Sequence, residues 1–206
     1  MEMDRSALEL MESGQNQTPL LRFFQWSSPA VSYGYLLDPE KVKDYSQANG
    51  NFPLVKRPTG GGAVLHQTTD LSISLLWPRH QKIFPEKPKE CYALIHQRIN
   101  KALSECLGLK PTSNPHLFSP CAGDPTPGPS PYGEGNPIRM GKRFSVCFSE
   151  PVCNDVMLGG EKIVGGALRL TRKAILYQGN IQWKGEKGSA FAADAFRHSL
   201  RLFFLF

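Results

Sequence analysis

The feature that most constrains the fold is a series of short apolar segments, each too short for a typical helix and each bounded by turn-forming residues. The turn signals are Pro19, Pro29, the Asn49-Gly50-Asn51 run and three consecutive glycines, Gly60 to Gly62. The apolar segments span residues 20–26, 30–36, 52–57, 63–66 and 71–77. This pattern predicts a sheet built largely from strands that are neighbours along the chain.

A second pattern, with apolar residues every three or four positions, indicates helices. It is clearest from Lys89 to Leu107, where Gly108 follows as a typical helix stop, and it recurs in residues 3–12 and 191–206. Strand-like segments return before the final helix, at residues 143–149, 155–158, 162–170 and 173–181. We therefore expect an α+β fold with a mixed, largely antiparallel sheet flanked by helices.

The chain length of 206 residues fits one domain, and we expect a single domain spanning residues 1–206. Residues 111–142 are rich in Pro, Gly and Ser and show no apolar period, which predicts a long, mobile surface loop. No apolar stretch approaches the roughly 20 residues that cross a bilayer, and the acidic N-terminal segment lacks the pattern of a secretory signal. We expect a cytoplasmic protein with no membrane association.

The charge balance favours acidic partners. Lys and Arg number 24 against 18 Asp and Glu, which gives a formal net charge of +6 and a long-range attraction for anions. The basic residues are scattered, with no Arg/aromatic stripe or helix-turn-helix pattern, so we expect no nucleic-acid partner.

The five cysteines lack a CxxC pair and a zinc-type spacing with the histidines, so we expect neither a disulfide framework nor a metal site. Two of them, Cys91 and Cys106, fall on the apolar side of the helix at 89–107, where inert packing residues are expected.

The segment VKRPTGGGAVLH, residues 55–66, allows two interpretations. Gly60, Gly61 and Gly62 could connect residues 52–57 and 63–66 as a hairpin, or they could let a ligand lie against the backbone. Arg57 just before them could pair with a carboxylate or phosphate. The segment is not a P-loop, because no GK[ST] follows.

The segment GGEKIVGGALR, residues 159–169, raises a similar question. Glycines inside a strand, here Gly165 and Gly166, mark a bulge or a close backbone approach. Lys162 is either a solvated surface group or, if the two glycine-rich strands face each other, a cation that points into the same cleft as the triple glycine.

Two further residues could carry chemistry. Cys147 lies in a strand-like run, where burial is the simpler interpretation, but a nearby cation such as Lys162 could stabilise its thiolate and make it a nucleophile. His66 could be a satisfied core imidazole, and its functional interest rests on its place directly after the glycine segment.

Three segments, in their order along the chain, resemble the lipoate and biotin protein ligase family, and their sequences favour its lipoate and octanoate branch. LRFFQWSSPAVSYGYLLDPEKV is similar to the family's opening pattern, VKRPTGGGAVLHQTTDLSISL to its R-R-x-(S/T)-G-G-G-A-V-x-H-D segment, and GGEKIVGGALRLTRKAILYQGNI to its G-x-K-I-x-G-x-A-x-R segment. The chain departs from the family at Gln67, where aspartate is common, and at Tyr177, where histidine is common.

The resemblance implies a catalytic domain related to class II synthetase cores, and it implies site residues. Arg57 and Gly60 to Gly62 would hold the acyl or acyl-adenylate phosphate region, and His66 would close the strand beside the pocket. Lys162 would contact the activated carbonyl or its phosphate. Gly165, Gly166 and Ala167 would leave room for the acyl chain.

The resemblance also implies an activity: attachment of a lipoyl or octanoyl group to a lysine of a lipoyl domain, either in 2-oxoacid dehydrogenase complexes or in glycine cleavage H protein. Cys147 opens a CFSEP segment fifteen residues before Lys162, which is similar to the transferases that form a cysteine thioester and take the acyl group from acyl carrier protein.

Two alternatives remain. One is a lipoate-protein ligase that uses ATP and Mg²⁺ to form lipoyl-adenylate, and the other is a lipoate- or octanoate-binding module without turnover. Under the thioester hypothesis no tightly bound cofactor is expected.

Overall fold

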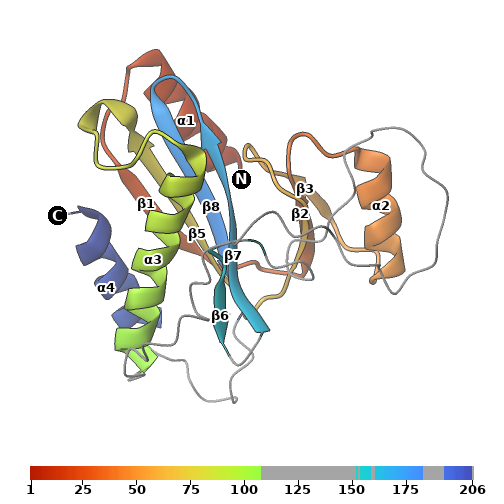
Figure 1. Cartoon of the computed structure of the whole chain (residues 1–206). Coiled ribbons are helices and arrows are strands. Elements are labelled where there is room, and N and C mark those ends of the chain that lie inside the picture. Colours follow the sequence, from red (N-terminus) through yellow and green to blue (C-terminus); the bar gives the residue numbers. More distant parts are fainter. Residues whose placement is uncertain (108–151, 153, 159–160, 183–192, 206) are drawn as a thin grey trace.

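A computed structural model of the protein describes residues 1–107, 152, 154–158, 161–182 and 193–205 (Figure 1). The predicted loop at 111–142 and the predicted strand at 143–149 lie outside these described residues. Within them, no helix is long and apolar enough to cross a bilayer.

The larger of two sheets has five strands in the order β1-β5-β8-β7-β6, and every pair is antiparallel. Its strands are β1 (Leu20–Phe24), β5 (Leu71–Pro78), β6 (Val156–Leu158), β7 (Glu161–Leu170) and β8 (Ala174–Ile181). β8 is the central strand. It lies beside β5, which comes about one hundred residues earlier in the sequence (Figure 1).

The smaller sheet contains β2 (Ala30–Tyr33), β3 (Leu54–Lys56) and β4 (Ala63–His66), in the order β3-β2-β4. The prediction that the front half forms one sheet of sequence neighbours is therefore wrong. β2 pairs with β4 in antiparallel fashion but with β3 in parallel, and a parallel pair needs a crossover connection rather than a tight turn.

Helix α2 (Pro39–Ala48) supplies this crossover, and the sequence patterns above do not predict it. The side chain of Asp38 accepts a hydrogen bond from the Glu40 N–H, and Pro39 occupies the start of the helix, where its missing N–H costs nothing. Only Val42 and Ser46 are buried, so the apolar stripe is too sparse to reveal the helix.

Helices α3 (Pro88–Leu107) and α4 (Ala193–Leu205) pack on one face of the five-stranded sheet (Figure 1). Alternate residues of β5, Leu75 and Trp77, face these helices, whereas Leu76 faces α1 (Glu2–Ser13) on the other side. The three predicted helices and the largely antiparallel α+β arrangement are confirmed. A short 3₁₀ helix, η1 (Arg79–Gln81), follows β5.

Candidate functional site

The triple glycine does not close a hairpin, because β2 lies between β3 and β4. Instead, the buried guanidinium of Arg57 binds the loop from inside. Its Nη2 donates to the carbonyl oxygens of Gly60 (3.0 Å) and Gly62 (2.8 Å), and its Nη1 donates to Ser32 Oγ (2.7 Å). Arg57 thus fixes the shape of the loop.

The loop also requires glycine on both sides of its contact with β2. Gly61 has a φ of 84°, in the left-handed region that favours glycine. A Cβ on Gly34, just after β2, would overlap the backbone of Gly60 and Gly61, whereas a Cβ on Gly60 would meet nothing within 4 Å. Gly34, which sequence analysis did not single out, is therefore part of the loop's packing.

His66 lies at the end of β4, buried beside the same hydroxyl. Its Nε2 is 2.5 Å from Ser32 Oγ, and Trp26 stacks on its ring with centroids 4.3 Å apart. Burial, and then the Arg57 charge, lowers the pKa of His66 from 6.5 to about 3, although the Asn180 side chain opposes this. Since Arg57 already donates to Ser32 Oγ, the Ser32 hydroxyl donates a hydrogen bond to Nε2 of a neutral His66.

A small cavity of about 30 Å³ lies where the two sheets meet, which is room for about one water molecule. It brings together five of the predicted site residues, namely Arg57, His66, Gly165, Gly166 and Ala167. Its described lining includes neither Lys162 nor Gly60 to Gly62, and Cys147 lies outside the described residues.

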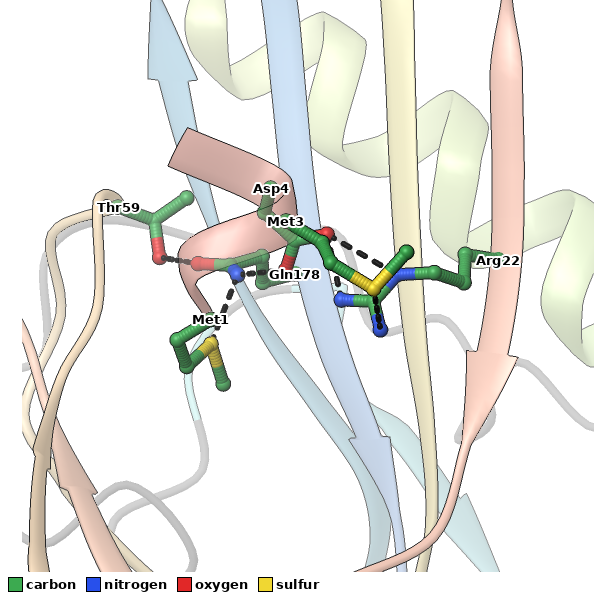
Figure 2. Close-up of polar contacts among 6 residues, drawn as sticks. All are labelled: Met1, Met3, Asp4, Arg22, Thr59 and Gln178. Carbon is green, nitrogen blue, oxygen red and sulfur yellow. Dashed lines mark hydrogen bonds and ion pairs between the residues drawn. The ribbon is translucent and has the colours of Figure 1, made fainter. Parts of the chain in front are cut away.

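The polar groups around the cavity are tied to the body of the protein. Thr59 Oγ1, in the glycine loop, is 2.8 Å from Gln178 Oε1 on β8, and Gln178 Nε2 donates to Asp4 Oδ2 (2.6 Å) on α1. The same Asp4 binds Arg22 of β1 at 2.6 Å (Figure 2). The loop is thereby linked to two strands of the five-stranded sheet and to α1.

Lys162 is not the solvated surface group that one interpretation allowed. Its side chain is 4% exposed and its Nζ lies 2.7 Å from Oδ2 of Asp155, whose side chain is 1% exposed. The same Oδ2 accepts from the Val152 N–H (2.7 Å), and Oδ1 accepts from the Tyr92 hydroxyl (2.7 Å). Lys162 and Asp155 form a buried ion pair.

The Tyr92 hydroxyl, on α3, also accepts a hydrogen bond from the Gly166 N–H at 3.2 Å. Gly166 lines the cavity, so the lysine pair and the cavity meet at this one residue. A Cβ on Gly166 or on its β8 partner Gly179 would overlap the Tyr177 ring. The missing side chain at Gly166 thus makes room for Tyr177 within the protein.

Two further buried groups complete this cluster. The Tyr177 hydroxyl and His96 Nε2 are 2.9 Å apart, and both residues are 0% exposed. Burial is the main cause that lowers the pKa of His96 to about 3, and the Lys162 charge lowers it further. Burial likewise raises the pKa of Tyr92 and Tyr177, so all three groups are neutral near pH 7.

Sequence analysis missed Ser32, Tyr92, His96 and Asp155. Tyr92 belongs to the apolar stripe of α3 and was grouped with its packing residues. The tyrosine hydroxyl on this apolar stripe was the signal that could have revealed it, because buried hydroxyls and imidazoles need hydrogen-bond partners.

Cys91 and Cys106 lie in the described part of the chain, and neither thiol is activated as a nucleophile. Burial raises the pKa of the Cys91 thiol to about 11, and burial followed by Glu105 raises that of Cys106. Both act as packing residues, as predicted. In the described part of the chain, no three His, Cys, Asp or Glu residues gather closely enough to hold a metal ion.

Comparison with known sequences identifies relatives across most of the chain. The family described as lipoyl protein ligase A/B catalytic domain matches residues 1–200. An octanoyltransferase LipM from Macrococcus caseolyticus is 31% identical over 183 residues, covering 88% of this chain and 60% of the relative. LipM from Staphylococcus aureus is 29% identical over 187 residues with the same coverage. The chain therefore spans about 60% of the length of these curated relatives.

Solved structures share the fold. A lipoate-protein ligase A bound with ATP matches with a TM-score of 0.58 and 23% identity, covering 95% of this chain and 75% of the other. An archaeal bi-partite lipoate protein ligase from Thermoplasma acidophilum, described with its E2 lipoyl domain, matches with a TM-score of 0.52 and 20% identity, covering 95% and 67%. At these identities the likeness is one of fold.

Proposed function

We propose, because the chain belongs to the lipoyl protein ligase A/B catalytic-domain family, that it transfers a lipoyl or octanoyl group to a lysine of a lipoyl carrier domain. The observation that supports this most is the set of relatives that match 88% of the chain and are octanoyltransferases. The net charge of +6 favours acidic lipoyl domains as partners. The expected setting is the cytoplasm, with one catalytic domain over residues 1–206.

In this proposal Cys147 is the nucleophile. Its thiolate attacks the carbonyl of an acyl thioester such as octanoyl carrier protein, a new C–S bond forms, and the carrier thiolate leaves. The amine of the acceptor lysine then attacks the Cys147 thioester, an amide bond forms, the Cys147 thiolate leaves, and the amine gives up a proton to water. Lys162 supplies the positive charge that stabilises the oxyanion.

The cavity at the junction of the sheets would receive the acyl group. Gly165, Gly166 and Ala167 offer little side-chain volume there, and Arg57, which holds the glycine loop through the Gly60 and Gly62 carbonyls, lines the cavity as well. An eight-carbon chain would extend beyond this space of about 30 Å³. His66, neutral and next to Ser32, would close the end of the pocket.

A second candidate is an ATP-dependent lipoate ligase that works through lipoyl-adenylate, with ATP and Mg²⁺ as substrates. It is favoured by the fold shared with a ligase solved with ATP and with a bi-partite archaeal ligase. In that case Arg57 and the glycine loop would contact phosphate.

A transfer assay onto a purified lipoyl domain separates the candidates. Octanoyl carrier protein and lipoate plus ATP serve as donors for the wild type and for the Cys147→Ser and Lys162→Ala variants. We expect transfer from octanoyl carrier protein only, with a labile octanoyl adduct visible by intact mass and lost in Cys147→Ser. Cys106→Ser is the matched control, because Cys106 is a packing residue whose thiol pKa is raised.

ATP-dependent transfer that survives Cys147→Ser would select the ligase. Binding of octanoate or lipoate with transfer from neither donor would select a binding module.

A further inference from the structure

Burying the ion pair of Lys162 and Asp155 costs desolvation free energy. Both side chains are almost fully buried, and removing two charges from water costs several kcal/mol that their attraction only partly restores. A well-packed apolar pair would give similar stability. The charge at this place therefore calls for an explanation beyond folding.

The carboxylate is held on every side. Asp155 Oδ2 pairs with the Lys162 ammonium and accepts a hydrogen bond from the Val152 N–H. Its Oδ1 accepts a hydrogen bond from the Tyr92 hydroxyl. Tyr92 stands on α3, and its ring stacks on His96 with centroids 4.0 Å apart. Because the hydroxyl of Tyr92 is fixed by this packing, it in turn fixes the direction of the carboxylate and thus the position of the ammonium.

The register of β7 makes Tyr92 the partner of Gly166. β6 pairs only with residues up to Val164, and Ile163 is an extra residue between the pairs Met157–Lys162 and Val156–Val164. A bulge bends the strand and locally disrupts its pairing. The Gly166 N–H, beyond the end of β6, donates to Tyr92 instead of to a strand. One hydroxyl thus joins the lysine pair to the wall of the cavity.

We propose that Asp155 and Tyr92 are positioning residues that hold the Lys162 ammonium in a fixed place relative to the Gly166 wall of the acyl pocket. This inference rests on the proposed function for its catalytic meaning, but its geometry can be tested without any turnover. Asp155 supplies the charge that keeps the ammonium in place, and Tyr92 supplies the direction.

Tyr92→Phe removes one hydroxyl and little volume, so it is the main test. The Gly166 amide loses its acceptor, and we expect its hydrogen exchange, followed by NMR, to quicken by about tenfold or more. In the transfer assay we expect kcat to fall by about tenfold at nearly unchanged KM. Tyr45→Phe, a hydroxyl deletion on α2 outside this cluster, is the control and should change neither.

Asp155→Asn and Asp155→Glu test the charge. The ¹H–¹⁵N signal of the Lys162 ammonium, protected from solvent in the wild type, should disappear in Asp155→Asn and return in part in Asp155→Glu, with kcat following the same order. If Asp155→Asn does not fold, Tyr92→Phe decides alone.

Unchanged Gly166 exchange and an unchanged Lys162 signal in Tyr92→Phe would overturn the inference, as would a rise in KM with kcat preserved. If the wild type transfers no acyl group from any donor, the proposed function fails, and the two NMR signals still decide whether Tyr92 and Asp155 position Lys162.

Discussion

The buried cations on the two sides of Gly166, Arg57 and Lys162, are stabilised in different ways. On the cavity side, Arg57 donates to two glycine carbonyls and to the Ser32 hydroxyl. On the α3 side, the charge of Lys162 meets a full opposite charge on Asp155. A guanidinium has five fixed donors that can hold several backbone carbonyls at once, whereas an ammonium is a compact point charge that an anion stabilises. The first arrangement shapes the backbone, and the second places a charge.

Breaking the ion pair should have the largest effect on stability. Asp155→Asn leaves the Lys162 ammonium buried without its anion, and we expect a loss of about 3–5 kcal/mol in the free energy of unfolding, measured by urea denaturation. Asp194→Asn is the matched control, because Asp194 pairs with Arg197 on α4 while 95% exposed, and we expect no measurable change. Equal losses in the two variants would mean that the buried pair is not special.

Each side contains one buried neutral histidine, which sharpens the comparison. The folded-state pKa of His66 and of His96 is about 3 against 6.5 for the free side chain. Below pH 6.5 the unfolded chain therefore binds protons that the folded chain does not. Stability is lost as the pH is lowered from about 6.5 to 3, and these groups do not affect it above that window. At pH 5 each histidine should cost about 2 kcal/mol.

Urea titrations at pH 7.5 and pH 5 measure this loss. In His66→Gln and in His96→Gln, the drop between the two pH values should shrink relative to the wild type by similar amounts. An unchanged drop in one variant would show that this histidine is protonated in the folded state.

A pair of alanine substitutions tests the glycine loop from its two sides. Gly34→Ala would push a Cβ into the backbone of Gly60 and Gly61, which cannot yield as a side chain could, and we expect a loss of about 1–3 kcal/mol. Gly60→Ala meets open space and should leave thermal stability nearly unchanged. The opposite order in melting temperature would show that the loop does not pack against β2 as described.

The smallest expected effect concerns the link between the loop and β8. Thr59→Val removes the hydroxyl that bonds Gln178 (2.8 Å) while keeping the shape, so we expect about 1 kcal/mol of destabilisation. Binding of octanoate or lipoate should weaken in parallel, because the loop loses its tie to the sheet. Weaker binding without any loss of stability would instead mean that Thr59 contacts the ligand itself.

Local patterns predicted most of the elements but not all of their partners. The helical period at 89–107 and the strands around Ala63 and Leu71 follow from residues that lie close in sequence. The parallel pairing of β2 with β3, in contrast, depends on α2, whose apolar stripe consists of little more than Val42. Nothing within a short window reports that a strand will skip its nearest neighbour.

The same distinction holds at the site. Arg57, His66 and Gly165 to Ala167 were singled out from sequence motifs and do gather at the cavity. Asp155 and Tyr92 meet across 63 residues of sequence, and their pairing depends on how α3 crosses the sheet. The sequence showed a tyrosine and an aspartate in unremarkable places. Only packing makes one hydroxyl serve both Asp155 and Gly166.

The central position of β8 has a consequence for the order of folding. Until residues 174–181 leave the ribosome, β5 has β1 on one side and an open edge on the other, and the glycine-bearing strand β7 lacks its longest partner. Sheet pairings over such long sequence distances form slowly, and exposed edges invite aggregation meanwhile. The part of the cavity wall that β7 and β8 contribute is therefore completed only after residues 174–181 have been made.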